Sequence, residues 1–229
     1  MIDPKKIFVC VVFHHSELRE RGSEVIMDFC DSWREHMFPY TLVVLDNAST
    51  IDYTEHLNGI DHHFIRVANE VTNGGITGAW NQLCRYAGDN GAEIITGFAD
   101  DAILNPSFND YITSITDDNI VYAPLTDGIA GGPWQFQKSN TIKPNYTHNS
   151  DIVNGFWLGF TRKFYLDKVD DGELFPKNKV PEMDDWAGQE LILPYWGRVH
   201  GTRCITIGDC WLKHTKLRSW KAARGKYNG

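Results

Sequence analysis

The stretch VVLDNAST, residues 43–50, ends an apolar run in a cluster of small polar side chains. The run from Thr41 to Leu45 has the composition of a short buried strand, and the residues that follow it are typical of a turn. FADD, residues 98–101, repeats this pattern at the end of a second run, Glu93 to Phe98. Two apolar strands that end in carboxylates predict a polar edge on a buried sheet.

Helix and strand patterns alternate around these two stretches. Hydrophobic residues recur at four-residue spacing between Val25 and Met37, which predicts a helix over Ser23 to Met37. Two more strands and a second, glycine-led helix are expected over Ile7 to Phe13, His63 to Ala68 and Gly75 to Ala87. This alternation predicts an α/β fold with a mostly parallel central sheet flanked by helices, and with ligands at the carboxyl ends of the strands.

The pattern is looser in the second half of the chain. The expected elements there are a helix over Pro106 to Ile115, a strand over Asn119 to Leu125, a long loop over Asp127 to Ser150, a strand over Ile152 to Phe160, a helix over Met183 to Trp196 and a strand over Cys204 to Leu212. The sequence has no internal repeat and no break in composition that would mark a linker. We therefore expect residues 1–229 to form one domain, with a first half to about residue 104 and a second half from about 105.

Composition excludes several classes of protein. The 229 residues are 42% hydrophobic and 23% charged, which is typical of a compact soluble domain, and the net charge of −8 argues against a general nucleic-acid binder. Five cysteines without CxxC spacing indicate neither a disulfide framework nor a zinc site. No apolar stretch approaches the roughly 18 residues of a membrane span. We expect a cytoplasmic protein.

Asp100 and Asp101 follow a predicted strand directly. Adjacent carboxylates in this position suit Mg²⁺ or Mn²⁺, which prefer oxygen ligands and often keep substrate phosphates in their coordination shell. The alternative is a helix-capping or turn role, which Asp also favours. A glycine-rich entry to the next predicted helix, Asn73-Gly74-Gly75, would favour an anion, although it is neither GxGxxG nor a P-loop.

The order VVLDNAST, NGGITGAWN and FADD resembles the nucleotide-sugar half of glycosyltransferase family 2 and related GT-A fold enzymes, including rhamnosyltransferase-like members. Asn73 and Asn81 reproduce the family's spacing of an N-x-G and a second Asn. The resemblance covers about residues 5 to 104. It implies a GT-A fold and a metal-dependent transferase that moves a sugar from a nucleotide-diphosphate sugar to an acceptor hydroxyl, with Mn²⁺ or Mg²⁺ as cofactor and inversion at the anomeric carbon.

The resemblance also implies roles for residues of the donor site. Asp46 would accept a hydrogen bond from the base or ribose, and Asp101 would bind the metal with Asp100 as a helper that also contacts the donor. The other implied donor-site residues are Phe13, His14, Asn47, Ser49, Asn73, Gly75 and Asn81. For Asp46 an Asx turn is the alternative, and Asn73 and Asn81 could instead have structural roles. Ala99 replaces the first Asp of the family's D-x-D motif, which leaves open weakened metal use or a protein that only binds.

Acceptor-side roles are implied by the second half. PEMDDWAGQ resembles the family's E-D-x-D segment, which makes Asp185 the first candidate for the catalytic base and Asp184 the second, with Glu182 possible; helix capping is the alternative. NGFWLGFTR, residues 154–162, would place Gly155 where donor and acceptor meet. Trp134, Trp157 and Trp186 could stack on sugars, although a core position is the alternative for Trp157 and for Trp186. The acceptor would be a glycan or a lipid-linked molecule.

His214 resembles a late histidine of the family that would complete the metal shell or meet the diphosphate. The chain has nine histidines, and the alternative is that His214 is not a ligand. From Lys213 onward the chain carries six Lys or Arg residues and no acid, which favours a lid over a diphosphate, contact with anionic lipid, or a solvated end.

Three hypotheses follow. The first is the glycosyltransferase, and the second is a nucleotide-sugar or glycan-binding protein without turnover. The third is a nucleotidyltransferase, against which the segment His14-His15-Ser16-Glu17 stands where a basic glycine-rich loop would be expected.

Overall fold

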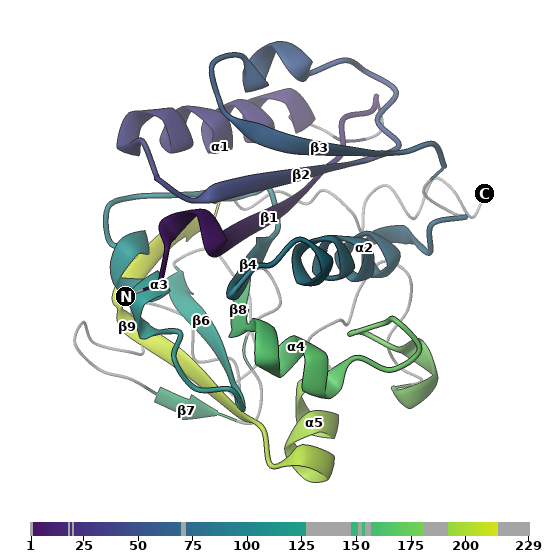
Figure 1. Cartoon of the computed structure of the whole chain (residues 1–229). Coiled ribbons are helices and arrows are strands. Elements are labelled where there is room, and N and C mark those ends of the chain that lie inside the picture. The colour runs from purple at the N-terminus through teal and green to yellow at the C-terminus, as the bar shows by residue number, and fades with distance from the viewer. Residues whose placement is uncertain are drawn as a thin grey trace.

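The computed structural model describes residues 2–17, 19, 21–69, 72–126, 148–150, 153, 157–180 and 192–214. In these ranges the chain forms a mixed, mostly parallel sheet of nine strands in the order β3-β2-β1-β4-β8-β6-β9-β5, with β7 paired to β9 (Figure 1). This confirms the predicted α/β fold class.

The parallel part of the sheet comes from the first half of the chain. It contains β1 (Ile7–Phe13), β2 (Thr41–Asn47), β3 (His62–Val67) and β4 (Ile94–Phe98). The strand β1 pairs in parallel with both β2 and β4, and β2 pairs in parallel with β3. The carboxyl ends of these strands therefore lie along one edge of the sheet, which is where α/β proteins bind ligands.

The remaining strands extend the sheet beyond β4. They are β5 (Ala102–Ile103), β6 (Ile120–Thr126), β7 (His148–Ser150), β8 (Trp157–Thr161) and β9 (Arg203–His214). The strand β8 is antiparallel to both β4 and β6, whereas β6 and β9 are parallel. The short strands β5 and β7 are each antiparallel to β9.

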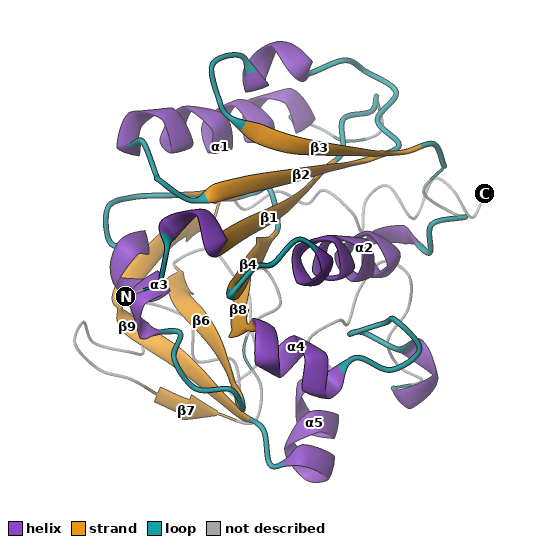
Figure 2. Cartoon of the chain, viewed as in Figure 1, coloured by secondary structure: helices purple, strands orange, loops and turns teal. Residues whose placement is uncertain are grey.

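Helices cover both faces of the sheet (Figure 2). The helices are α1 (Gly22–His36), α2 (Gly75–Asp89), α3 (Phe108–Ser114), α4 (Arg162–Lys168) and α5 (Ile192–His200), with 3-10 turns at Pro4–Lys6, Thr54–Leu57 and Lys177–Lys179. Side chains of β1 alternate between the two faces, as the two-residue period of a strand requires: Val9 and Val11 pack with α1 and α3, whereas Cys10 and Val12 pack with α2, α4 and α5. Burial on both faces explains why the strand is apolar throughout.

The structure corrects several element boundaries. The segment His148–Ser150, expected in a loop, is strand β7, and α4 forms directly after β8 where no helix was expected. The predicted helix over 183–196 is described only from Ile192, where α5 begins and continues to His200. Most of the predicted loop over 127–150 lies outside the described residues.

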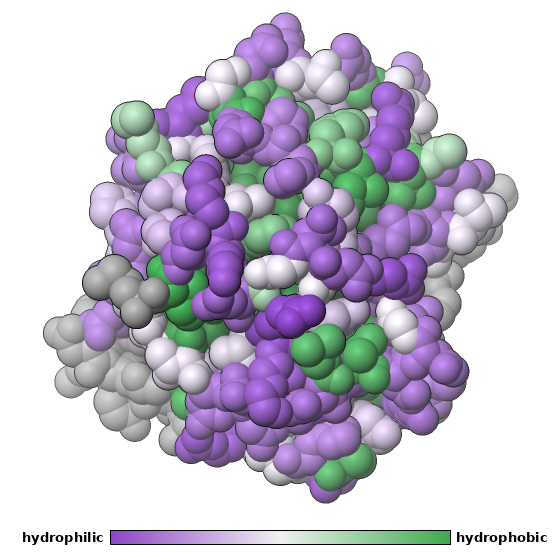
Figure 3. All heavy atoms as spheres, in the orientation of Figure 1, coloured by the Kyte–Doolittle hydropathy of each residue, from purple (hydrophilic) through white to green (hydrophobic). Residues whose placement is uncertain are grey.

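The surface seen in Figure 3 is mainly hydrophilic, and its apolar residues form small patches. None of the helices in the described ranges is both long and apolar enough to cross a membrane.

Candidate functional site

Three strand ends meet at one edge of the sheet. The register pairs Phe13 of β1 with Asp46 of β2, and Val11 of β1 with Phe98 of β4. The residues that follow β1, β2 and β4 therefore lie side by side, and they carry most of the polar side chains that the sequence indicated. We call this edge the strand-end site.

Asp46 lies at the bottom of the strand-end site with its side chain 2% exposed. Its Oδ1 accepts a hydrogen bond of 3.1 Å from the backbone N–H of Ser49, which is the Asx-type turn that the sequence allowed. Its Oδ2 is 3.3 Å from Nε of Arg66 on β3, and the Arg66 side chain is 64% exposed. One carboxylate oxygen is thus held by the turn, and the other faces a cation that can move.

Tyr53 lies behind Asp46. Burial, together with the charge of Asp46, raises the pKa of this phenol above its ordinary value. Its hydroxyl is buried and makes no hydrogen bond that meets ordinary geometric limits within the described part of the chain. Neither Tyr53 nor Arg66 was singled out by sequence reasoning, because both lie outside the motifs and approach Asp46 only through the fold.

His14 connects β1 to β2. Its Nδ1 lies 2.8 Å from the carbonyl oxygen of Asn47, and its Nε2 lies 2.9 Å from Oγ of Ser16. Because a carbonyl oxygen can only accept, Nδ1 donates to Asn47. The His14 side chain is buried, so it fixes the spacing of the two strand ends.

Asn47 and Ser49 also have structural contacts. Asn47 is fully buried, its Oδ1 is 3.4 Å from Nδ2 of Asn73, and its own Nδ2 has no hydrogen-bond partner among the described residues. Oγ of Ser49 accepts a bond of 2.9 Å from the backbone N–H of His15. These contacts place Asn47, Ser49 and Asn73 in one polar layer beneath the site.

The structure pairs Asp100 with a residue that sequence reasoning missed. Nη1 and Nη2 of Arg19 donate to the two carboxylate oxygens of Asp100 at 2.6 and 2.7 Å, and Nη1 also donates to the carbonyl oxygen of His14 at 2.7 Å. The side chains of Arg19 and Asp100 are only 3% and 6% exposed. Burial alone would lower the pKa of Arg19, but Asp100, with a further contribution from Asp101, raises it.

This pairing does not favour the predicted role of Asp100 as a helper of the metal, which stays a prediction. A metal ligand needs an oxygen lone pair directed at an accessible position, whereas the Asp100 side chain is almost fully buried and each of its oxygens accepts a hydrogen bond from Arg19. Asp101, by contrast, is half-buried.

Strained backbone precedes these aspartates. Gly97 and Phe98 have φ angles of 116° and 104°, and Ala48 at the end of β2 has a φ of 59°. A Cβ atom on Gly97 would lie 2.3 Å from the carbonyl oxygen of Cys10, so only glycine fits there. Positive φ at a non-glycine residue is unfavourable and is concentrated at functional sites.

The pairing of β5 with β9 places His214 opposite Ala102. Because Ala102 follows Asp101 directly, the backbones of Asp101 and His214 lie close together. A carboxylate and an imidazole suit a divalent transition-metal cation whose shell is completed by oxygens from a bound ligand. The described side chains contain no cluster of three or more His, Cys, Asp or Glu residues that could hold a metal by itself.

Three predicted site residues have structural positions instead. The amide of Asn81 is used by Phe175: Oδ1 accepts from its backbone N–H at 2.8 Å, and Nδ2 donates to its carbonyl oxygen at 3.3 Å. Trp157 is fully buried and donates from Nε1 to Oγ1 of Thr96 at 3.1 Å. Phe13 is fully buried in the core. These positions do not fit the predicted ligand contacts, because none of the three side chains is open to a bound sugar or nucleotide.

The glycine turn before α2 has a clear steric basis. Gly74 and Gly75 have φ angles of 76° and 63°, and a Cβ atom on Gly78 would lie only 1.5 Å from the carbonyl oxygen of Asn73. Oδ1 of Asn73 accepts a hydrogen bond from Nε2 of Gln82. Gly75 is buried, so this turn supports the strand-end site from below.

Several predicted residues lie outside the described part of the chain. They are the base candidates Asp184, Asp185 and Glu182 and the acceptor-side residues Trp134, Gly155 and Trp186. Their roles stay predictions.

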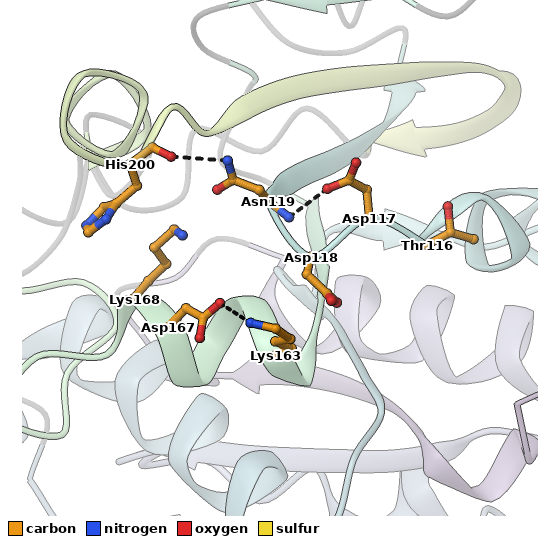
Figure 4. Close-up of a pocket in the computed structure, with 8 residues that line it drawn as sticks. All are labelled: Thr116, Asp117, Asp118, Asn119, Lys163, Asp167, Lys168 and His200. Atoms are coloured by element: carbon orange, nitrogen blue, oxygen red, sulfur yellow. Dashed lines mark hydrogen bonds and ion pairs between the residues drawn. The ribbon is translucent and has the colours of Figure 1, made fainter.

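A surface pocket of about 770 Å³ lies at the opposite edge of the sheet, where β6 begins and β8 ends (Figure 4). Its charges largely balance one another, since Lys163 and Asp167 form an ion pair at 2.6 Å. Burial lowers the pKa of both Lys168 and His200, which lie near each other on one side of the pocket. This mixed lining offers no clear chemistry, so we place the candidate site at the strand ends.

Solved structures resemble this fold over almost its whole length. A mannosyltransferase from Pyrobaculum calidifontis, PcManGT, solved with GDP-Man and Mn²⁺, matches with a TM-score of 0.63 and 15% identity over 96% of this chain. GalNAc-T7, solved with UDP, GalNAc and Mn²⁺, matches with a TM-score of 0.59 and 15% identity over 90% of it. The chain has a GT-A fold. The resemblance inferred from the sequence is confirmed at the level of the fold.

PcManGT and GalNAc-T7 are longer than this chain and share only 15% of its sequence. The chain spans 59% of PcManGT and 42% of GalNAc-T7. A nucleotidyl transferase from Methanothermobacter also matches, with a TM-score of 0.55 and 14% identity over 97% of this chain and 95% of its own. No protein-family model matches the sequence, and no curated protein does.

Proposed function

We propose that this GT-A protein is a divalent-metal-dependent glycosyltransferase that uses a nucleotide-diphosphate sugar as donor. The observation that carries the proposal is the convergence of Asp46, Asp101 and the backbone of His214 at the carboxyl edge of the sheet. Two of the structures that match the fold, PcManGT and GalNAc-T7, were solved with GDP-Man or UDP and with Mn²⁺, which supports this class of donor and cofactor.

The nucleoside would bind over β2. Asp46 offers a buried carboxylate that can accept from a base N–H or a ribose hydroxyl, and Arg66 can move aside because its side chain is mostly exposed. Ser49 and Asn47 shape the floor beneath it. A carboxylate with one oxygen held by a turn and the other paired with a mostly exposed arginine can accept a new hydrogen-bond donor when that arginine moves.

The diphosphate would bind near β4 and β5, with Asp101 and His214 as the chain's ligands to Mn²⁺ or Mg²⁺. A divalent cation bound there would neutralise charge on the departing nucleoside diphosphate. The acceptor hydroxyl would lose its proton to Asp185, or to Asp184, and attack the anomeric carbon with inversion. The acceptor-side roles rest on resemblance alone.

The deciding experiment measures thermal unfolding with UDP-, GDP-, dTDP- and CMP-sugars, each with and without Mn²⁺. A ligand that binds only the native state raises Tm, so one nucleotide family should raise it and should require the metal. Asp101→Ala should remove the shift without unfolding the protein. No shift with any donor in folded protein would contradict the proposal.

A nucleotidyltransferase is the second candidate. The match to the Methanothermobacter protein favours it, because the two chains have nearly the same extent. The products distinguish the two reactions: a nucleotidyltransferase releases pyrophosphate from a nucleoside triphosphate, whereas a glycosyltransferase releases a nucleoside diphosphate from a nucleotide sugar.

Because Ala99 stands where the family's motif has its first Asp, a protein that binds a nucleotide sugar without transferring the sugar is a third candidate. If the missing carboxylate abolishes transfer, the wild-type protein should bind a nucleotide sugar without consuming it, and Ala99→Asp should produce or increase transfer. Measurable transfer by the wild-type protein, lost in Asp101→Ala, would remove this candidate.

We also propose a reducing, cytoplasmic location. This proposal is supported by the five cysteines, which are all buried free thiols, because thiols stay reduced in the cytoplasm.

A further inference from the structure

Arg19 occupies a position that the donor-site proposal does not use. It lies in the segment between β1 and α1, where its backbone N–H donates to Ser16 at 3.0 Å and its carbonyl oxygen accepts from Gly22 at 3.1 Å. These bonds anchor the residue close to the end of β1. Its guanidinium group then extends to the turn after β4, which carries Asp100 and Asp101.

The contact with Asp100 has the geometry of a strong ion pair. Two parallel N–H donors meet the two carboxylate oxygens at 2.6 and 2.7 Å, and both side chains are almost fully buried. A planar guanidinium group in a bidentate contact fixes the carboxylate in orientation as well as in position. Withdrawing Asp100 from this contact would leave a buried charge without its partner, which is unfavourable.

The third contact of Arg19 connects the two strand ends. Nη1 also donates to the carbonyl oxygen of His14, and the His14 ring in turn contacts the backbone of Asn47, the last residue of β2. One chain of hydrogen bonds therefore runs from the Asn47 backbone through His14 and Arg19 to Asp100. It fixes the nucleoside side of the strand-end site relative to the turn that carries Asp101.

We propose that Arg19 is a positioning residue of the donor site: it holds Asp100 in the interior and thereby orients the turn so that a divalent cation binds through Asp101 and not through Asp100. The inference rests on the proposed function, since it concerns the metal of the same site. It also assigns a role to the second Asp of Ala99-Asp100-Asp101 that differs from ligation.

The direction in which Arg19→Met changes the affinity for Mn²⁺ distinguishes a positioning role of Arg19 from metal ligation by Asp100. If Asp100 were a metal ligand, Arg19 would compete with the metal, and Arg19→Met would leave Mn²⁺ affinity unchanged or increase it. If Arg19 positions the turn, Arg19→Met should decrease Mn²⁺ affinity by about 10-fold, which is within the range for residues that orient metal ligands. Arg19→Lys should recover part of that loss, because it keeps the charge and loses only the bidentate geometry.

The measurement is Mn²⁺ binding by electron paramagnetic resonance, in the presence of UDP and, separately, of GDP. Asp101→Asn should abolish specific Mn²⁺ binding. Arg19→Met and Asp100→Asn should have similar effects, and the double variant should lose no more than either single variant, because the two residues act as one unit. Arg203→Met is the matched control, since its ion pair with Asp117 at 3.6 Å lies at the other edge of the sheet.

Urea unfolding without metal or nucleotide provides an independent measurement on the same variants. The double variant Arg19→Met with Asp100→Asn removes both charges, so it should unfold at a higher urea concentration than Arg19→Met, which leaves Asp100 buried and unpaired. Because the double variant carries neither charge, its Mn²⁺ binding can still be measured if a single variant folds poorly.

Each outcome has one meaning. Unchanged or tighter Mn²⁺ binding in folded Arg19→Met, or loss of binding in Asp100→Asn as complete as in Asp101→Asn, would overturn the positioning role while the donor-site proposal stands. If the wild-type protein bound no Mn²⁺ in the presence of any nucleotide of the thermal panel, both the positioning role and the donor-site proposal would be overturned. Additive stability effects of the two single substitutions would show that the ion pair itself does not form.

Discussion

Asp46 and Arg66 form an ion pair in the strand-end site, with 3.3 Å between Oδ2 of Asp46 and Nε of Arg66. The carboxylate is buried and the guanidinium group is mostly exposed, so the pair has one fixed and one mobile partner. An incoming nucleoside can therefore displace Arg66 without unburying Asp46. This arrangement makes Asp46 the most direct test of where the nucleoside binds.

Asp46→Asn should weaken binding of the cognate nucleotide by roughly 10- to 100-fold, because a hydrogen bond to a charged group contributes about 1.5–3 kcal/mol. Isothermal titration with the nucleotide identified by the thermal panel measures the change. Asp61→Asn makes the same charge change at a side chain that is 99% exposed, and it should leave affinity as it is. Equal effects of the two substitutions would argue that only net charge matters.

His214→Asn should decrease the affinity for Mn²⁺ by at least about 10-fold, because an imidazole that binds a metal is replaced by a weaker ligand. The magnitude is read from the Mn²⁺ concentration that gives half of the nucleotide-dependent rise in Tm. His63→Asn is the control, since His63 is an exposed residue of β3 that contacts Tyr86. If His214→Asn behaved like this control, the metal would be held without His214.

Gly78→Ala should destabilise the protein by about 1–3 kcal/mol or more, since its Cβ atom would lie 1.5 Å from the carbonyl oxygen of Asn73 and the turn would have to shift. Denaturant unfolding monitored by circular dichroism gives the free energy. Gly197→Ala is the matched helical control: its nearest neighbour would be the carbonyl oxygen of Thr202 at 3.4 Å, and alanine favours a helix. We expect that variant to be as stable as the wild type or up to about 1 kcal/mol more stable.

Stability should fall as pH rises above about 8.5, the ordinary pKa of a thiol. Burial raises the pKa of Cys30 and Cys210 to about 12, and it also raises that of Cys10 and Cys84. The unfolded chain then releases protons that the folded protein keeps, so the unfolded state is favoured at alkaline pH. Each such thiol should contribute a loss of about 1 kcal/mol by pH 9.5.

Urea midpoints at pH 7.5 and 9.5 measure this loss, and Cys84→Ala should make it smaller. A midpoint independent of pH over this range would show that the thiols are accessible to water in the folded protein.

The parallel half of the fold was predictable from local sequence. The strand β1 was expected over Ile7 to Phe13 and is found at those residues, because it is apolar on both faces and bounded by polar residues. The helix α2 begins at the predicted Gly75, where positive φ at two glycines sets the turn. In both cases the residues that decide the structure are neighbours in sequence.

The contacts of single site residues are harder to predict than strands and helices, for a physical reason. A motif gives the place of a residue along the chain but not the partners that the fold brings to it. Asp100 carries the expected side chain at the expected strand end, yet Arg19, from the segment after β1, takes both of its oxygens. Phe13 ends a strand whose alternation directs it into the core with Val9 and Val11.

The position of β9 has a consequence for how the chain is made. Residues Arg203–His214 lie near the end of this sequence, yet they pair with β6 and β5 from its middle. While the protein is being synthesised, β1 to β4 can assemble as soon as they leave the ribosome, whereas β6 lacks its parallel neighbour until β9 has been made. During that interval the backbone N–H and C=O groups of β6 that pair with β9 lack their partners. We expect chains that stop before residue 203 to aggregate rather than to accumulate as a smaller folded protein.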